Sequence, residues 1–386
     1  MSLKVFILAG EPSGDRLGGA LMRGLQDLAP GVSFEGVGGP MMAAQGLASR
    51  FPMEELSVMG LAEVLPKYRH LKRRIRETAE AVLKMQPDVL ITIDSPDFSL
   101  RVAKLVKTAS TIRTVHYVAP SVWAWRPGRA AKMAGVIDHV LALLPFEPPY
   151  MEAAGMECDF VGHPVVAEPQ ATPQEIARFR VDFGLADAPF LLVLPGSRRT
   201  EVSRLAPVFG EAVKPFLKAH PRYKVVVPAA EPVADLVKEH LGLWPGKPVL
   251  LDPRALTPEL AAAHKRAAFA GADLALAASG TVSLELAAAA TPMVIAYDFQ
   301  WLTWQVMKRM ALIDTVTLVN LVSETRVVPE CLGPECTPER IAARLGEVAR
   351  APQAQQAAMA LTMERLGRDG EAPGLRAAGA VLDRLG

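Results

Sequence analysis

A carboxylate follows an apolar run in the first third of the chain, where it could act on a hydroxyl group. Asp94 ends the segment ITID, and residues 89–93 before it have the apolar character of a buried strand. Open α/β sheets bind ligands beyond the carboxyl ends of their strands, and an aspartate there can serve as a general base. The alternative is that Asp94 holds a loop amide. Asp97, at the start of the next helix, is explained more simply as a cap.

A glycine turn in the second half could bind a diphosphate. The segment LLVLPGSRRTEV passes from an expected strand through Gly196 and Ser197 into a helix, with Arg198 in the turn. Backbone amides at the start of a helix bind phosphate oxygens, and one guanidinium can donate hydrogen bonds to two phosphate oxygens at once. We therefore expect these three residues to contact a diphosphate.

A second corner of the same kind lies in LALAASGTVSLELA. There Ser279, Gly280 and Thr281 open a helix, and Glu285 follows one turn later. A carboxylate at that point can accept hydrogen bonds from two ribose hydroxyls. The two corners together therefore resemble a pocket for a nucleoside diphosphate. The alternative is that Ser279 and Thr281 only cap the helix.

Near the N-terminus, the first expected strand leads into GEPSGDRLGG. The glycines allow a ligand to approach the backbone, and Ser13, Gly14 and Asp15 stand where a helix N-terminus could bind an anion. The spacing matches neither the dinucleotide fingerprint nor a P-loop. A tight turn capped by Ser13 or Asp15 is the alternative.

The segment HYVAPSVWAWRPGR places Trp123 and Trp125 beside Arg126 in a stretch interrupted by prolines and a glycine. This composition indicates a shaped loop. One ring of a Trp-x-Trp pair can pack into the scaffold while the other borders a cleft. In the alternative, both rings fill the bottom of a helix.

Between Glu55 and Arg76, apolar residues precede a cluster of cations. The apolar residues are Leu56, Val58, Met59, Leu61 and Leu65, and the cations are Lys67, Arg69, Lys72, Arg73, Arg74 and Arg76. Such a stretch suits the surface of an anionic bilayer, where each cation contributes roughly 1 kcal/mol. The alternative is a solvated helix whose other side, with Tyr68, Leu71 and Ile75, faces a core.

Short apolar runs alternate with helix-length segments along most of the chain, which predicts parallel sheets covered by helices. With 386 residues, the chain is long enough for two domains. The expected strands are residues 4–9, 33–37, 89–93, 111–118, 139–143 and 158–161, and then 190–194, 224–227, 248–251, 274–277 and 293–296. We predict an α/β fold of two doubly wound domains, residues 1–170 and 171–350. Residues 351–386 are expected to form helices that pack on the first domain or on a second subunit.

Composition narrows the class of protein. The formal net charge is +1, which argues against a nucleic-acid binder that relies on bulk positive charge. The three cysteines have no C-x-x-C spacing, so we expect neither disulfides nor a metal site, and a cytoplasmic protein is consistent with this. The apolar run at residues 5–9 is too short for a signal peptide or a membrane span, so any membrane contact should be peripheral.

Several of these segments, taken in order, resemble the lipid A disaccharide synthase family over nearly the whole chain. They are GEPSGDRLGG, ELSVMG, DSPDF, YVAPSVWAWRPGR, LPFE, VGHPVV, LLPGSRRTEV, ASGTVSLE and TPMVIAY, of which SVWAWR and LPGSR-x-x-E are the most distinctive. The resemblance implies a GT-B fold, with two Rossmann-like domains facing a cleft. It implies an inverting glycosyltransferase of Gram-negative lipopolysaccharide synthesis without cofactor or metal. This enzyme joins UDP-2,3-diacylglucosamine to 2,3-diacylglucosamine 1-phosphate and releases UDP.

The resemblance also implies roles for single residues. Asp94 becomes the base for the acceptor's 6-hydroxyl, and Arg198 stabilises the departing UDP. The donor site would comprise Gly196, Ser197, Arg198, Ser279, Gly280, Thr281, Glu285, Tyr297 and Asn320. The acceptor and the inner membrane would face Ser13, Gly14, Asp15, Val58, Met59, Leu61, Arg69, Lys72, Arg73, His116 and Arg126. A homodimer through the C-terminal domain and a peripheral position on the cytoplasmic face are further implications.

The chain departs from the family pattern after Tyr297. Asp298 and Trp301 stand where a basic residue and a proline are expected, and the segment between Val319 and Arg326 also differs, although Asn320 is retained. We therefore expect the donor contacts of this segment, but not the reaction, to differ from those of the family. The competing hypotheses are another UDP-sugar enzyme on the same fold, such as an epimerase or a peptidoglycan-precursor transferase, and a non-catalytic protein that binds lipid at the membrane surface.

Overall fold

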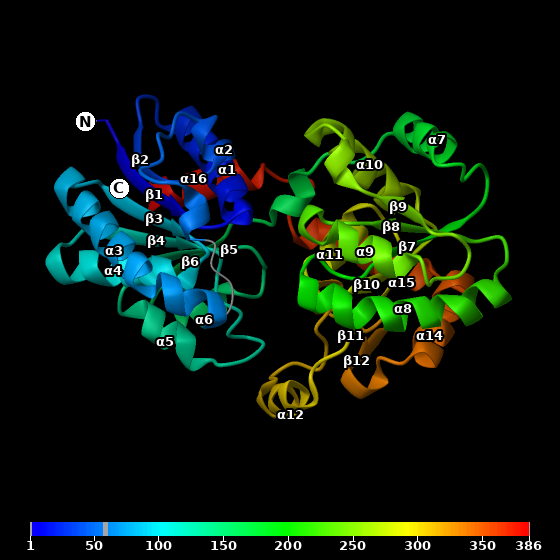
Figure 1. The fold of residues 1–386 in the computed structure, drawn as a ribbon. Helices are drawn as coiled ribbons and strands as arrows, with labels where there is room; N and C mark the ends of the chain where they lie inside the picture. The colour runs from blue at the N-terminus through cyan, green and yellow to red at the C-terminus, as the bar shows by residue number, and fades with distance from the viewer. Residues whose placement is uncertain (1, 57–60, 386) are drawn as a thin grey trace. The chain divides into compact units, whose positions relative to one another are not determined.

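The computed structural model describes residues 2–56 and 61–385, and the side chains of residues 61–68, 301 and 302 are not part of the description. The chain divides into two compact units (Figure 1). Unit 1 comprises Met1–Ala167 and Leu366–Gly386, and unit 2 comprises Glu168–Arg365. No described helix combines the length and the hydrophobicity needed to cross a bilayer.

Unit 1 contains a parallel sheet of six strands in the order β2-β1-β3-β4-β5-β6. The strands are β1 (Lys4–Ala9), β2 (Ser33–Val37), β3 (Val89–Ile93), β4 (Arg113–Tyr117), β5 (His139–Ala142) and β6 (Glu157–Phe160). The α-helices are α1 (Pro12–Leu28), α2 (Pro40–Ala43), α3 (Leu61–Met85), α4 (Pro96–Ala109), α5 (Gly128–Ala134), α6 (Pro148–Glu152) and α16 (Pro373–Asp383). Short 3-10 helices span Met53–Glu55 and Pro164–Ala167.

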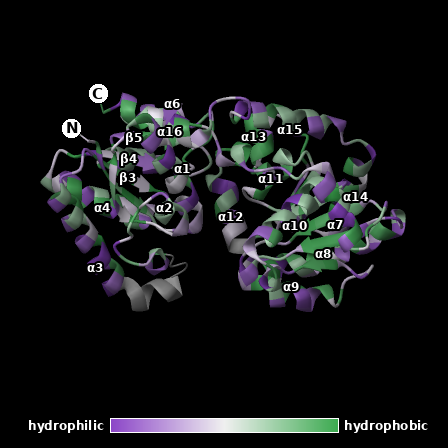
Figure 2. Cartoon of the chain, turned by 90° about the horizontal axis from the view of Figure 1, so that it is seen from above, coloured by the Kyte–Doolittle hydropathy of each residue, from purple (hydrophilic) through white to green (hydrophobic). Residues whose placement is uncertain are grey.

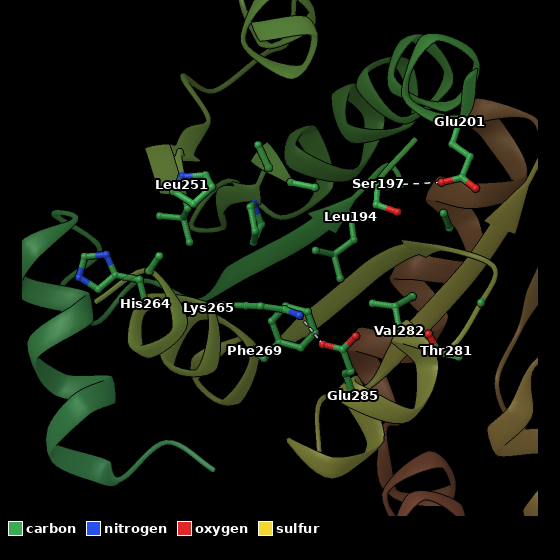
Figure 3. Close-up of a pocket in the computed structure, with 18 of the residues that line it drawn as sticks. Leu194, Ser197, Glu201, Leu251, His264, Lys265, Phe269, Thr281, Val282 and Glu285 are labelled. Carbon is green, nitrogen blue, oxygen red and sulfur yellow. Dashed lines mark hydrogen bonds and ion pairs between the residues drawn. The ribbon is translucent and has the colours of Figure 1, made fainter. Parts of the chain in front are cut away.

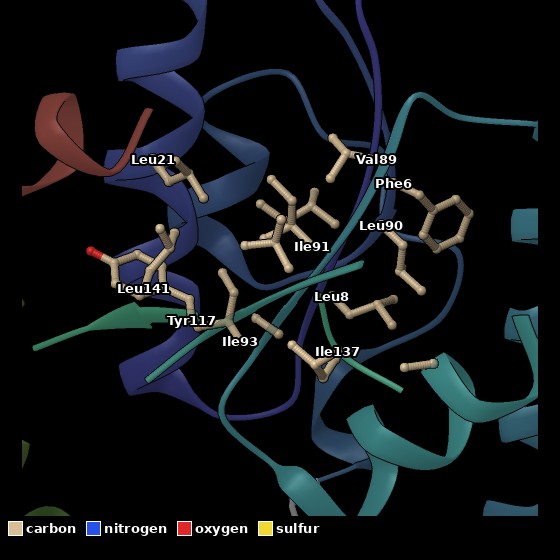
Figure 4. Packing of buried hydrophobic residues seen from close by; sticks show 14 of the residues in the cluster. Phe6, Leu8, Leu21, Val89, Leu90, Ile91, Ile93, Tyr117, Ile137 and Leu141 are labelled. Atoms are coloured by element: carbon tan, nitrogen blue, oxygen red, sulfur yellow. The ribbon is translucent and has the colours of Figure 1, made fainter. Parts of the chain in front are cut away.

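The core of unit 1 forms around the central strands because their side chains are apolar on both faces of the sheet. Phe6, Leu8, Ile91 and Tyr117 are all buried there (Figure 4). Helix α16, from the end of the chain, packs closely on α1. A Cβ added at Gly24 of α1 would lie 2.7 Å from the carbonyl oxygen of Gly374, so this close approach requires a glycine.

Unit 2 contains a second parallel sheet, in the order β12-β11-β10-β7-β8-β9. Its strands are β7 (Phe190–Leu194), β8 (Lys224–Pro228), β9 (Val249–Leu251), β10 (Leu274–Ala278), β11 (Met293–Tyr297) and β12 (Glu330–Leu332). Its α-helices are α7 (Pro173–Asp182), α8 (Arg199–Ala219), α9 (Ala234–Leu241), α10 (Pro258–Gly271), α11 (Val282–Ala288), α12 (Trp301–Met310), α13 (Leu318–Ser323), α14 (Pro338–Arg350) and α15 (Gln353–Arg365). Short 3-10 helices span Glu231–Val233, Pro253–Ala255 and Gly333–Glu335.

The expected α/β fold class is confirmed, and each strand predicted from the sequence is present. Strand β12 was not predicted, because three residues at a sheet edge are too few to show a pattern. Figure 2 shows hydrophobic residues on the strands of unit 2 and mixed character on its helices, as expected for a sheet covered on both faces.

The strand order reverses once in each sheet, between β1 and β3 in unit 1 and between β7 and β10 in unit 2. Ligands of open α/β sheets bind at this point, beyond the carboxyl ends of the two strands. Four of the segments expected to carry chemistry, those that begin at Gly10, Asp94, Gly196 and Ser279, follow these four strands, so each unit positions two of them at its own reversal point.

Candidate functional site

A cavity of about 620 Å³ lies at the reversal point of unit 2 (Figure 3). The corner after β7, the corner after β10 and one face of α10 form its walls. The residues that were expected to bind a nucleotide and that line it are Gly196, Ser197, Arg198, Ser279, Gly280, Thr281 and Glu285. The fold therefore brings both predicted corners to one cavity.

The corner after β7 is organised by Glu201, in the first turn of α8. Its carboxylate accepts hydrogen bonds from the amides of Ser197 (3.1 Å) and Arg198 (3.3 Å). Gly196 has a φ of 116°, and a Cβ there would lie 2.6 Å from the Cβ of Glu201, so both conformation and space require a glycine. The guanidinium of Arg198 lies 3.6 Å from the Glu201 carboxylate, and its side chain is 60% exposed. Glu201 occupies the two amides, whereas the largely exposed guanidinium can exchange its ion pair with Glu201 for an anion.

The corner after β10 leaves backbone open to the cavity. Gly280 has a φ of 153°, and no atom lies within 4 Å of the position that a Cβ would take. Thr281 precedes α11 without making a capping hydrogen bond, so a capping role does not explain its hydroxyl. Ser283 donates to the carbonyl of Gly280 at 3.0 Å and holds the turn. A ligand can approach the backbone closely here.

Helix α10 contributes residues that the sequence analysis did not predict. Lys265 and Phe269 line the cavity, and the Lys265 ammonium forms an ion pair with Glu285 and lies 5.2 Å from the Phe269 ring centroid (Figure 3). Together with Ala261 they follow a spacing of four residues, which puts all three on one helical face. In this Ala-rich helix, the spacing was the only feature of the sequence that could have pointed to Lys265 and Phe269. Glu285 is thus paired with a cation in this structure.

Two expected donor residues lie outside this cavity. Tyr297, at the end of β11, borders a separate hollow beside the first turns of α8, and burial raises the pKa of its hydroxyl. Asn320 is buried, and its amide bonds the backbone of Val328 in both directions, at 2.9 Å and 3.0 Å. Asn320 therefore holds the loop before β12.

In unit 1, Asp94 stands at the carboxyl end of β3, beside the end of β1. Asp94 and Ser95 both have left-handed backbones, with φ of 48° and 45°. Each such residue costs roughly 1–3 kcal/mol, and strain of this kind concentrates at functional sites. The carbonyl of Asp94 accepts from the Ser99 hydroxyl at 2.8 Å. No hydrogen bond to its carboxylate occurs among the described residues, so the alternative role of holding a loop amide is not observed.

The loop after β1 uses its aspartate internally. Asp15 is buried, and its carboxylate accepts from the amides of Gly39 (2.8 Å), Met41 (2.8 Å) and Met42 (3.0 Å) at the start of α2. Helix α2 is thus capped by a residue from α1, because a buried helix start needs acceptors for its free amides. Ser13 is exposed in the first turn of α1, and Gly14 is buried against β1 and β3.

His116 lies inside the sheet on β4. Its Nδ1 is 2.8 Å from the hydroxyl of Thr92 on β3, and that hydroxyl also lies 3.2 Å from the carbonyl of Val115. Burial lowers the pKa of His116 to about 4, so the ring is neutral at physiological pH. It can act there as a neutral hydrogen-bonding group.

The tryptophan segment forms a loop between β4 and α5. The Trp123 indole donates to the Glu147 carboxylate at 3.1 Å and meets Phe146 edge to face at 5.1 Å. The ring of Trp125 lies beneath the exposed guanidinium of Arg126, at 4.3 Å. One ring is therefore tied to the scaffold and the other supports a cation. Both rings belong to a loop, so they do not fill the bottom of a helix, and the expectation that one ring borders a cleft stays a prediction.

Glu147 makes the loop sensitive to pH. Its buried carboxylate also accepts from the amides of Leu143 (3.2 Å) and Leu144 (3.0 Å), yet desolvation outweighs these bonds and raises its pKa to about 7. Because the folded-state pKa exceeds the usual 4.5, the stabilisation from protonation is complete below 4.5 and is lost as the pH rises to about 7. The buried His116 and His163, whose pKa values are lowered to about 4, change the total stability in the opposite sense over this range, so the contribution of Glu147 is measured as a difference. We expect the free energy of unfolding of the wild type minus that of Glu147→Gln, measured in urea at each pH, to fall between pH 4.5 and about 7. The substitution should also cost about 1–3 kcal/mol because an amide cannot accept all three bonds. A difference that does not change with pH would contradict this account.

The basic stretch lies on α3. Arg69, Lys72 and Arg73 are exposed, whereas Ile75 faces the core, so both expected sides of the helix are present. Arg73 lies 3.5 Å from Glu77, which offsets part of its charge. Val58 and Met59 lie outside the described residues, and so does the side chain of Leu61.

Comparison with known proteins supports the assignment suggested by these motifs. A family model described as lipid-A-disaccharide synthetase matches residues 5–372. A lipid-A-disaccharide synthase of Ruegeria pomeroyi is 74% identical over 383 residues, which cover 99% of this chain and 96% of the relative. One from Rhodospirillum centenum is 47% identical over 387 residues, covering 99% and 94%.

Solved structures with little sequence identity share the fold. The UDP-GlcNAc 2-epimerase of Neisseria meningitidis, bound to UDP-GlcNAc, matches with a TM-score of 0.62 at 11% identity, over 99% of this chain and 98% of that one. MurG of Acinetobacter baumannii matches with a TM-score of 0.57 at 14% identity, over 99% of both chains. The fold is thus that of the GT-B glycosyltransferases and UDP-sugar epimerases, and the sequence matches place the chain within that group: it belongs to the lipid-A-disaccharide synthase family of glycosyltransferases.

Proposed function

We propose that the protein transfers 2,3-diacylglucosamine from its UDP derivative to the 6-hydroxyl of 2,3-diacylglucosamine 1-phosphate, which gives the lipid A disaccharide 1-phosphate and UDP. The observation that carries the proposal is the cavity of unit 2, where both predicted phosphate corners and Glu285 meet. Membership of the family disfavours an epimerase, a peptidoglycan-precursor transferase and a non-catalytic lipid binder.

In the donor complex, Arg198 binds the diphosphate and the open backbone at Gly280 lets the ligand approach. Glu285 exchanges its ion pair with Lys265 for the ribose hydroxyls, and Lys265 becomes available to a phosphate oxygen. Support comes from the exposed guanidinium, from the empty space at Gly280 and from the Lys265–Glu285 pair across the cavity. The chemistry then needs no metal, because cationic side chains can carry the charge of the leaving group.

Asp94 takes the proton of the acceptor's 6-hydroxyl. The oxygen of this hydroxyl attacks the anomeric carbon of the donor at the same time. The bond from that carbon to the diphosphate breaks, its electron pair leaves with UDP, and the configuration inverts. Arg198 stabilises the charge that develops on UDP. The strained turn at residues 94 and 95 and the carboxylate without a described hydrogen bond support this role for Asp94.

The acylated substrates call for a position at a membrane. We propose that residues 58–73 of unit 1 contact the cytoplasmic face of the inner membrane, with Arg69, Lys72 and Arg73 toward anionic headgroups, and that Arg126 borders the acceptor. The exposed cations on α3 support this placement. The role expected for His116 is not part of the proposal, because its side chain is buried inside the sheet. We also propose a homodimer formed through unit 2. We propose no nucleic-acid partner.

The decisive experiment supplies purified protein with both acylated glucosamine substrates in detergent and follows disaccharide 1-phosphate and UDP by mass spectrometry. We expect both products in equal amounts. Well-folded protein that gives no disaccharide, or that releases UDP without it, would overturn the proposed reaction.

For the donor site, we expect Glu285→Ala to weaken the binding of UDP by roughly 10- to 100-fold in calorimetry, because it removes charge-assisted hydrogen bonds to ribose. The affinity for 2′,3′-dideoxy-UDP should change little, so the variant should bind both nucleotides similarly. Glu239→Ala, at an exposed position on α9, is the matched control. An equal loss of affinity for both nucleotides would show that Glu285 does not bind the ribose hydroxyls.

A further inference from the structure

Helix α12 of unit 2 has no place in a hydrophobic core. Of its described side chains, residues 303–310, none is buried, whereas each other helix of eight residues or more in the described chain buries at least one. In Figure 1 it projects from the part of unit 2 that holds β11 and β12. Short helices in water depend on packing for their stability. An apolar helix of ten residues, WLTWQVMKRM, therefore needs a surface to lie against.

A small aromatic cluster ties the start of this helix to the sheet. The Phe299 ring lies 4.7 Å from Tyr297 and 5.7 Å from Trp304. A Cβ added at Gly333 would lie 2.7 Å from the Trp304 indole, so the indole rests directly on the backbone after β12. The attachment fixes the first turn. Of the residues that follow, Gln305, Met307 and Met310 are half-buried, whereas Val306, Lys308 and Arg309 are exposed.

The free part of the helix combines apolar and basic groups. Val306 and Leu312 are 54% and 60% exposed. Lys308 and Arg309 are exposed, and no salt bridge to either is found within the described part of the chain. No aspartate or glutamate occurs between Gln300 and Ile313. Exposed apolar residues beside cations, without acids, are the composition of helices that lie in the headgroup region of anionic bilayers.

We propose that α12 and the following residues Ala311 and Leu312 form a membrane-docking helix of unit 2, whose partner is an anionic phospholipid surface. It would be a second attachment, on a different unit from the basic stretch of α3. A single weak lipid contact gives only marginal and reversible binding, whereas two linked contacts reinforce each other. The proposal extends the proposed function, since the reaction uses acylated substrates, but its test requires no turnover.

Binding to vesicles of phosphatidylcholine with and without phosphatidylglycerol tests the proposal. We expect Lys308→Glu/Arg309→Glu and Val306→Ser/Leu312→Ser each to weaken cosedimentation with anionic vesicles by about tenfold or more. The control Leu243→Ser/Lys247→Glu changes an exposed apolar residue and an exposed basic residue elsewhere in unit 2 and should bind like the wild type. All should retain turnover on detergent-dispersed substrates. Failure of wild-type turnover would count against the reaction and not against docking.

A direct probe reports whether the helix enters the bilayer. Cys158, Cys331 and Cys336 are buried, so an environment-sensitive fluorophore can be attached selectively at Val306→Cys. Its emission should shift to the blue with anionic vesicles, and the same label at Leu243→Cys should not respond. No shift, together with wild-type vesicle binding of the α12 variants, would overturn the proposal. A lower molar mass of those variants in light scattering, with unchanged vesicle binding, would also overturn it and would assign the surface to a second copy of the chain.

Discussion

Asp94→Asn is expected to lower kcat by roughly two to four orders of magnitude while the affinity for UDP stays near that of the wild type. The amide cannot take the proton of the acceptor hydroxyl. Asparagine tolerates the left-handed backbone at this position as well as aspartate does, so the turn should keep its shape. Turnover of the acylated substrates and calorimetry with UDP measure the two effects separately.

Asp97→Asn is the matched control, since Asp97 is an exposed carboxylate in the first turn of α4, close to Asp94 in sequence. It should leave kcat within a few-fold of the wild type. Turnover by Asp94→Asn at the wild-type rate would remove Asp94 from the role of base. A joint loss of UDP binding and turnover would instead point to a change in folding.

The sequence predicted the elements that depend on local pattern. Each apolar run that was predicted to be a strand forms one. The corners after β7 and β10 lie at one cavity because parallel strands end at the same edge of the sheet. The reversal of strand order then placed both corners at one cavity. That step rests on topology, which the alternation of strands and helices already indicates.

Other features depend on contacts between distant segments, which no local pattern records. Asp15 looked like a residue for a ligand or for its own helix, yet its carboxylate caps α2 through the amides of Gly39, Met41 and Met42. Glu201 bonds back to the turn before its helix and occupies the amides of Ser197 and Arg198, so the exposed guanidinium of Arg198 is the group at this corner that can meet an anion. Lys265 reaches the cavity from an Ala-rich helix without any motif of its own.

Arg198→Ala should lower kcat by roughly 100- to 1,000-fold, the loss seen when one preorganised donor to a developing charge is removed. The guanidinium is the cation at the corner after β7 that lines the cavity, and Glu201 holds it at 3.6 Å while most of its side chain stays exposed. Negative charge accumulates on UDP as the glycosidic bond breaks. Removal of the guanidinium therefore destabilises the transition state more than the ground state. The affinity for UDP should therefore fall by a smaller factor than kcat.

Arg198→Lys discriminates between charge and geometry. Lysine keeps the charge but cannot bind two oxygens at once, so it should restore only part of the rate. Arg199→Ala, at the next position, which is also exposed but does not line the cavity of unit 2, should leave kcat nearly unchanged. Full activity of Arg198→Ala would contradict this role. The stabilisation of UDP would then be assigned to Lys265, the cation on the opposite wall of the cavity. The double variant with Lys265→Ala would then show the loss expected here for Arg198 alone.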